Sequence, residues 1–174
     1  MAIFGAVSDD ALQFVIDHAE FKNFSENQFL FVEGDLANAM YVLITGKVTV
    51  FRDWEGERFP LREMGRGECV GEMSFLACSA RSASVMAVEK VQVIEITNNL
   101  LADLYLSFPE QYTIIIMNMA REVCRRLEQA DRRLFVLDRA ASQPIQNARA
   151  RNTPTTPTTQ KAQKAQKSRS PAVV

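Results

Sequence analysis

Histidine is almost missing from this 174-residue chain, in which His18 is the only one. Its scarcity argues against a metal site built on histidines and against a serine–histidine catalytic arrangement. Cysteine is sparse too: Cys69, Cys78 and Cys124 make no CxxC pair and no even framework, so we expect reduced thiols. These shortages predict a protein that holds no metal and is not an enzyme.

Long apolar runs are absent as well. No stretch reaches the roughly 20 residues that a helix needs to cross a membrane. The N-terminus, MAIFGAVSDD, has neither the basic start nor the apolar run of a signal peptide. We therefore expect a cytoplasmic protein without a membrane span.

Acidic residues disappear after Asp138, and only basic residues carry charge from there on. The body of the chain is therefore acidic and its tail basic, although the net charge is only −1. An acidic body argues against a folded surface that binds DNA specifically. The basic tail can still attract an acidic partner weakly.

Short β-type runs dominate the middle of the chain. After a predicted amphipathic helix over Asp10–Glu20, which Ser8 precedes as a helix start, β-branched and aromatic runs alternate with turn residues about every ten positions. This pattern predicts a mainly β protein. We expect a jelly-roll β-barrel with a short N-terminal helix and a long C-terminal helix. The expected strands are Phe29–Val32, Met40–Ile44, Val48–Phe51, Phe59–Met64, Ser84–Val88 and Val91–Ile96.

Helical spacing returns after the last strand. Asn98 or Asn99 is expected to cap a short helix over Leu100–Leu106, and Pro109 suits the first turn of a long helix that reaches about Leu137. Apolar residues in this long helix follow steps of four and three, the pattern of a helix that packs on another helix. For the first half, a partner helix and the chain's own barrel are equally good interpretations. For the second half we favour a two-fold homodimer. This seam consists of Ile116, Ala120, Val123, Leu127, Ala130, Leu134 and Leu137.

The chain divides into four segments. A helical segment, 1–23, precedes the β-barrel, 24–97, and the C-terminal helices occupy 98–140. Residues 141–174 contain the low-complexity runs TPTTPTTQ and QKAQKAQK, which bury too little apolar surface to fold. We expect this last segment to be a disordered basic tail.

The most informative stretch is 71–83, between two expected strands. Gly71 allows a tight turn close to a ligand, and a helical turn over Met73–Ala77 would present free N–H groups to an anion. Arg81 can hold a phosphate in a bidentate contact, and Glu72 would suit a sugar hydroxyl. Taken alone, Glu72 and Arg81 favour a simpler interpretation, a surface ion pair.

The whole stretch closely resembles the phosphate-binding cassette of the cyclic-nucleotide-binding domain family. That family includes the catabolite activator protein, protein kinase A regulatory subunits and cyclic-nucleotide-gated channels. The resemblance covers about residues 10–138 and implies a jelly-roll sensor of cAMP or cGMP. Further matches at the family's spacing are Gly34, Asp35, Ala37, the run Met40–Leu43 and Gly46.

The resemblance also implies roles for single residues. Glu72 takes the position that binds the ribose 2′-hydroxyl, and Arg81 takes the position that pairs with the cyclic phosphate. Ser82 after the arginine favours cAMP over cGMP. The other implied ligand-site residues are Gly71, Met73, Ser74 and Ala83.

The sequence departs from the family at several positions. Phe75 replaces an aliphatic residue and Ala80 replaces a proline, while the residues of the long helix that could face the base are Arg121, Arg125 and Arg126. These arginines leave the base specificity open.

The resemblance to the catabolite activator ends at Asp138, and no helix-turn-helix pattern follows. We therefore expect a stand-alone sensor that acts through a dimer or an unknown effector protein. The alternative is an interaction protein that keeps the fold, does not sense a nucleotide, and docks through its long helix and basic tail. A cupin-like enzyme is disfavoured by the missing histidines, and DNA binding by the tail would be non-specific.

Overall fold

The computed structural model describes residues 2–142, so nearly all of the expected tail lies outside the described part. Residues 1–131 form one compact unit. A second unit begins at Arg132 and includes the last described turns of the long helix.

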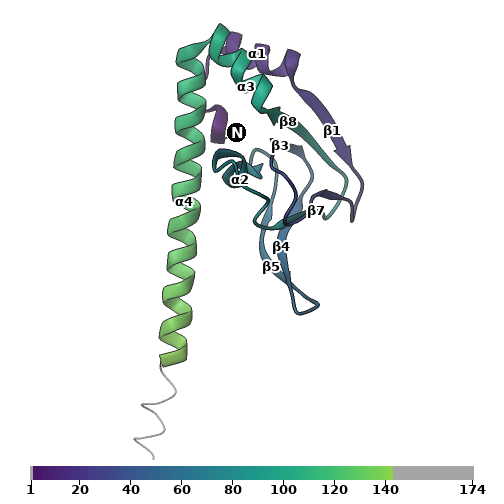
Figure 1. The fold of residues 1–174 in the computed structure, drawn as a ribbon, viewed down its shortest axis with the longest axis vertical. Helices are drawn as coiled ribbons and strands as arrows, with labels where there is room; N and C mark the ends of the chain where they lie inside the picture. The colour runs from purple at the N-terminus through teal and green to yellow at the C-terminus, as the bar shows by residue number, and fades with distance from the viewer. Residues whose placement is uncertain (1, 143–174) are drawn as a thin grey trace, which may run out of the picture. The chain divides into compact units, whose positions relative to one another are not determined.

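Two antiparallel four-stranded sheets build the jelly roll of the first unit (Figure 1). One has the order β1-β8-β3-β6 and the other the order β2-β7-β4-β5. This arrangement agrees with the mainly β fold expected from the sequence. The strands are β1 (Glu20–Phe24), β2 (Phe29–Phe31), β3 (Ala39–Thr45), β4 (Val48–Trp54), β5 (Glu57–Met64), β6 (Cys69–Val70), β7 (Ser84–Ala87) and β8 (Val91–Thr97).

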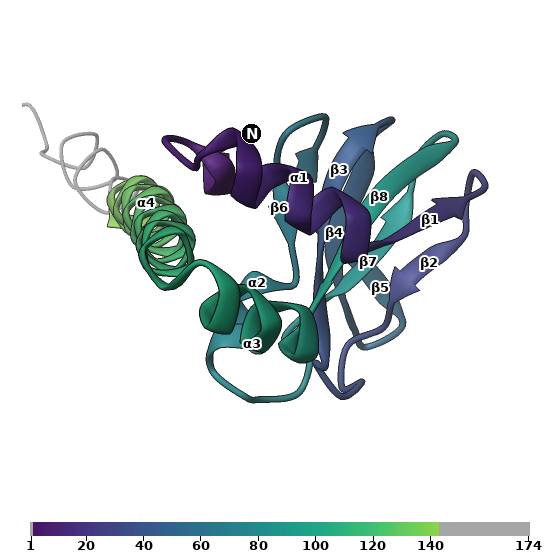
Figure 2. The same ribbon diagram turned by 90° about the horizontal axis from the view of Figure 1, so that it is seen from above.

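Strand β3 explains how two cores share one sheet. Because side chains alternate along a strand, Tyr41 and Leu43 point between the sheets, while Met40 and Val42 point toward the helices. Both faces are buried, which is why this strand is a continuous apolar run rather than an alternating one. The helices α1 and α3 cover the outer face (Figure 2).

The helices begin and end close to the expected residues. The Ser8 hydroxyl caps α1, and Pro109 opens α4 as predicted. Thr97, not Asn98 or Asn99, caps α3, because its hydroxyl accepts a hydrogen bond from Leu100 N at 3.2 Å. The helical elements are η1 (Ala2–Phe4), α1 (Asp9–His18), α2 (Glu72–Leu76), α3 (Asn98–Ser107) and α4 (Pro109–Ser142).

Two strands were not expected from the sequence. Strand β1 begins at Glu20, inside the segment 1–23 that was predicted to be helical, because Phe21 and its neighbours pair with β8. Strand β6 has only two residues and pairs with Tyr41 and Val42 of β3. Both are too short or too polar to give a pattern of their own.

Helix α4 buries a stripe that differs from the predicted seam. Its buried residues are Ile115, Met119, Glu122 and Arg126. This stripe keeps the four-three spacing but lies one residue earlier than the seam, and half of it is charged. Of the seam residues, Ile116 packs partly against the core, whereas Leu127 is 60% exposed.

Candidate nucleotide site

The cassette leaves β6 at Gly71 and rejoins the sheet at β7. Gly71 has a φ of +80°, a left-handed conformation that glycine adopts without strain. A Cβ atom at this position would overlap the Arg81 guanidinium and press on the Phe31 ring. Gly71 is therefore needed both for the turn and for the space that the arginine occupies.

Arg81 is held inside the protein, with only 3% of its surface exposed. Its Nη1 donates to Gly71 O at 2.9 Å, and its Nη2 donates to Ala39 O at 2.5 Å. The guanidinium also lies over the Phe31 ring, 4.1 Å from its centre. Burial lowers the pKa of Arg81, and a bound anion would favour its charged form.

Glu72 is the first residue of α2 and is 1% exposed. Its Oε1 forms an ion pair with Arg126 of α4, a contact that joins residues far apart in the sequence. Burial raises the pKa of this carboxyl, and the attraction of Arg126 opposes the shift only in part. The simpler interpretation of the sequence, a surface pair between Glu72 and Arg81, is wrong because both side chains are buried and neither binds the other.

Each of these two residues keeps one atom without a partner. Within the described part of the chain, Arg81 Nε and Glu72 Oε2 are buried and make no hydrogen bond. One is a donor and the other an acceptor, and such groups are costly when left unpaired. A ligand that carries an anionic oxygen and a hydroxyl group would satisfy both.

Arg126 is the member of the three candidate base contacts that reaches the cassette. Its Nη2 donates to Cys69 O at 2.7 Å, and its Nε donates to Glu122 at 2.8 Å. Arg125 is exposed and binds the other oxygen of Glu122. Arg121 is exposed and donates to Asn118 at 2.9 Å on its own helix.

The remaining predicted residues line the cassette in different ways. Ser74 is buried, and its hydroxyl accepts a hydrogen bond from Ser82 N at 3.3 Å, which ties α2 to the approach of β7. Ala83 is buried, as a close-packed strand start requires. Met73 and the Ser82 side chain are exposed.

Sequence reasoning missed the residues that support Arg81 and Arg126. Ala39 contributes only a backbone carbonyl, and Phe31 contributes the face of its ring, so neither residue type signals its role. Glu122 could have been noticed from its spacing, since it lies four residues before Arg126 in a helix.

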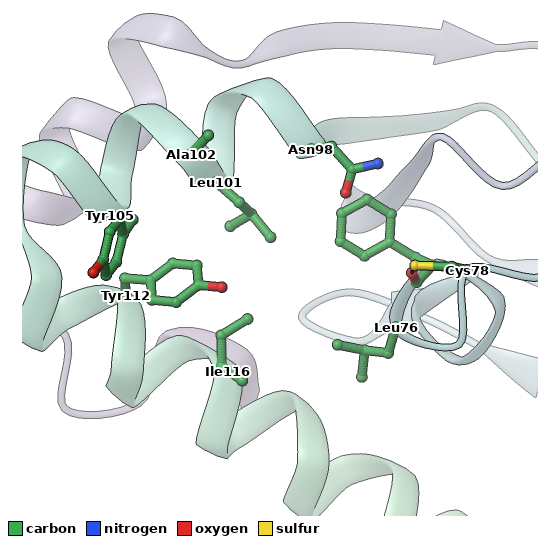
Figure 3. Close-up of a pocket in the computed structure, with 9 residues that line it drawn as sticks. Leu76, Cys78, Asn98, Leu101, Ala102, Tyr105, Tyr112 and Ile116 are labelled. Carbon is green, nitrogen blue, oxygen red and sulfur yellow. Dashed lines mark hydrogen bonds between the residues drawn. The ribbon is translucent and has the colours of Figure 1, made fainter.

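A cavity of about 410 Å³ lies beside the cassette, where α2, α3 and α4 meet. Figure 3 shows Leu76 and Cys78 on the cassette side and Leu101 and Tyr112 on the helical side. Cys78 is exposed and has a φ of +49°. Neither Glu72 nor Arg81 lines this cavity, so it is separate from the candidate nucleotide site.

Residues 2–142 provide neither a metal-binding cluster nor a membrane-spanning helix. No cluster of histidine, cysteine and carboxylate side chains there could hold a metal ion. No helix in the same range has both the length and the apolar content to cross a bilayer.

Comparison with known proteins agrees with this geometry. The sequence profile of the cyclic nucleotide-binding domain matches residues 21–108. The cyclic AMP receptor protein of Thermus thermophilus is 30% identical over 136 residues, which are 78% of this chain and 61% of the relative. The cAMP-activated global transcriptional regulator CRP of Salmonella typhimurium is 27% identical over 70% of this chain and 57% of its own length. The chain thus spans about three fifths of the length of these relatives.

Solved structures show the same fold. The catabolite activator protein of Thermus thermophilus superimposes with a TM-score of 0.70 at 29% identity, covering 79% of this chain and 63% of that one. A cyclic nucleotide-binding domain from Methylobacillus flagellatus also gives 0.70, at 21% identity and with 76% and 75% coverage. The second likeness concerns the fold alone.

Proposed function

The chain belongs to the cyclic nucleotide-binding domain family, and from this premise we propose that it is a regulatory sensor that binds cAMP in preference to cGMP. One observation carries the proposal: Arg81 and Glu72 are buried together in the cassette, and each keeps one unpaired polar atom. The cyclic phosphate would accept from Arg81 Nε, and the ribose 2′-hydroxyl would donate to Glu72 Oε2. No catalytic step is proposed.

The preference for cAMP rests on two supports. Ser82 follows Arg81, as in the cAMP-binding bacterial regulators that the cassette resembles. In addition, the relatives from Thermus thermophilus and Salmonella typhimurium carry cAMP in their names. The base itself would meet α4, where Arg126 is already engaged by Glu72.

The output of the sensor is proposed to run through α4. Arg126 links this helix to Glu72, so a ligand that contacts Glu72 also acts on the contact between the cassette and α4. We propose that the seam on α4 forms a homodimer and that an unidentified effector protein responds to the change.

A second candidate is supported by a specific observation. The Glu72–Arg126 ion pair already satisfies one oxygen of the carboxylate, and two backbone carbonyls already hold Arg81. A protein that keeps the fold for interaction alone could retain these contacts for stability.

Titration calorimetry of the full chain separates the two candidates. cAMP, cGMP and 5′-AMP would be titrated in turn, with 5′-AMP as the non-cyclic control. The sensor is expected to bind cAMP saturably, with micromolar or tighter affinity, and to bind 5′-AMP much more weakly. No heat with either cyclic nucleotide, in a protein whose circular dichroism shows it folded, would favour the interaction protein.

A further inference from the structure

Glu122 is a buried acidic residue of α4 that supports Arg126 and makes no hydrogen bond or ion pair to Glu72 or Arg81. It is only 6% exposed, although most residues around it in α4 are polar. A buried carboxylate is expensive unless it is paired and hydrogen-bonded. Glu122 meets both conditions through Arg125 and Arg126.

The contacts of Glu122 decide how Arg126 is oriented. Arg126 uses Nε for Glu122, Nη2 for Cys69 O and Nη1 for Glu72, so each side of its planar guanidinium has one partner. Glu122 is the partner that lies on the same helix, four residues earlier. Glu122 therefore holds Arg126 at Nε and leaves its Nη1 directed toward Glu72.

Charge supports the same arrangement. Burial opposes ionisation of Glu122, but the hydrogen bonds and charges of Arg125 and Arg126 outweigh it and hold the pKa of this carboxyl below its ordinary value. Glu122 is thus an anion at neutral pH. The carboxyl groups of Glu72 and Glu122 thus lie against the guanidinium groups of Arg125 and Arg126, so two acidic side chains are paired with two basic ones.

We propose that Glu122 is a positioning residue for nucleotide binding: it holds Arg126 so that Arg126 occupies Oε1 of Glu72 and leaves Oε2 directed at the ribose hydroxyl of the ligand. The inference rests on the proposed function, because it assigns Glu122 to the same site. Glu122 acts only through Arg126 and Glu72 and touches no ligand atom itself.

This role makes a prediction that a purely structural role does not. If Glu122 acts through the ribose contact of Glu72, its removal should lower the affinity for cAMP. The affinity for 2′-deoxy-cAMP, which lacks the hydroxyl, should hardly change. If Glu122 only stabilised the fold, its removal would lower the affinity for both nucleotides to the same extent.

The test compares Glu122→Ala with Glu128→Ala, an exposed glutamate of the same helix, by titrating the full chain with both nucleotides. For wild type and Glu128→Ala we expect cAMP to bind better than the deoxy compound. For Glu122→Ala we expect a loss of about tenfold for cAMP and less than twofold for 2′-deoxy-cAMP. Glu122→Gln keeps the size and one acceptor, so it should fold even if the alanine variant does not, and it should show a smaller loss with the same selectivity.

The outcomes are distinguishable. Equal losses for both nucleotides, or no loss for either, would overturn the role of Glu122 while leaving the sensor in place. A wild-type protein that binds neither nucleotide would overturn the sensor and this inference with it.

Discussion

Gly71 has no Cβ atom and so leaves the space that the Arg81 guanidinium occupies. Replacing Gly71 tests how strongly the cassette depends on that space. Gly71→Ala adds a Cβ in a left-handed turn and also overlaps the guanidinium. We expect it to lower the free energy of unfolding by more than about 2 kcal/mol, since the φ cost alone is about 1 kcal/mol, and to abolish nucleotide binding. Urea unfolding and calorimetry measure the two effects.

Gly56 provides the matched control. It has a similar φ of +85° in the β4–β5 turn, but a Cβ there would meet nothing within 4 Å. Gly56→Ala should therefore cost only about 1 kcal/mol and leave binding intact. If both variants lowered the free energy of unfolding equally, the overlap with Arg81 would not contribute to the cost of Gly71→Ala.

The three cysteines should differ sharply in reactivity. Cys69 is 1% exposed, and burial raises the pKa of its thiol to about 12, whereas Cys78 and Cys124 are exposed. Because the thiolate is the reactive form, iodoacetamide at pH 8 should modify Cys78 and Cys124 and spare Cys69 until urea is added. Peptide mass spectrometry reads the sites, and fast modification of Cys69 in the folded protein would show that β6 opens.

The candidate site was predictable where the sequence resembles a known motif. Arg81 and Glu72 were assigned to the site because the stretch 71–83 resembles the phosphate-binding cassette of a known family, whereas the two residue types alone favoured a surface ion pair. The Glu72–Arg126 contact was not predictable, because the two residues are far apart in the chain and Arg126 has the same sequence signal as Arg125. Only packing decides which of two adjacent arginines turns inward.

Helix α4 presents two stripes, and they should have different functions. The buried stripe contains Ile115 and Met119 and continues into the Glu122–Arg126 pair. The seam one residue later leaves Leu127, Leu134 and Leu137 exposed. The seam is therefore available for a second copy of the chain, as a regular heptad spacing indicates.

A charge placed in the seam tests the proposed homodimer. Leu134→Asp should raise the dimer dissociation constant by about a hundredfold or more, since a carboxylate would be buried without a partner. Val136→Asp is the control, because Val136 is similarly exposed but lies outside the seam. Sedimentation velocity would contradict the seam if Leu134→Asp stayed as dimeric as Val136→Asp, or if the wild type were a monomer.

Among the helices and strands, the sequence predicted those whose apolar residues follow a regular pattern. The β3 and β8 runs and the amphipathic α1 were predicted within a few residues. Strand β1 was missed because Glu20, Lys22 and Asn23 hide its alternation, and the buried stripe of α4 was missed because half of it is charged. In both cases tertiary contacts override the local pattern.

At the scale of the molecule, the Glu72–Arg126 ion pair connects the cassette with α4. Glu72 belongs to α2 and Arg126 to α4, and both are nearly fully buried. Removing one partner of such a pair leaves an uncompensated charge, which typically costs 3–5 kcal/mol. A ligand that contacted Glu72 would therefore act on a contact that matters to the packing of α4, as the proposed sensor requires.

The measurement that tests the central claim most directly is a calorimetric titration of Arg81→Ala with cAMP, beside Arg66→Ala, which removes an exposed arginine. Losing a buried, charge-assisted phosphate contact should weaken binding by roughly 2–5 kcal/mol, about thirtyfold or more. Arg81→Lys keeps the charge but loses the planar fork, so it should be weakened as well. Arg66→Ala should bind as the wild type does. If folded Arg81→Ala bound cAMP with wild-type affinity, the phosphate would not lie in this cassette and the account would be wrong.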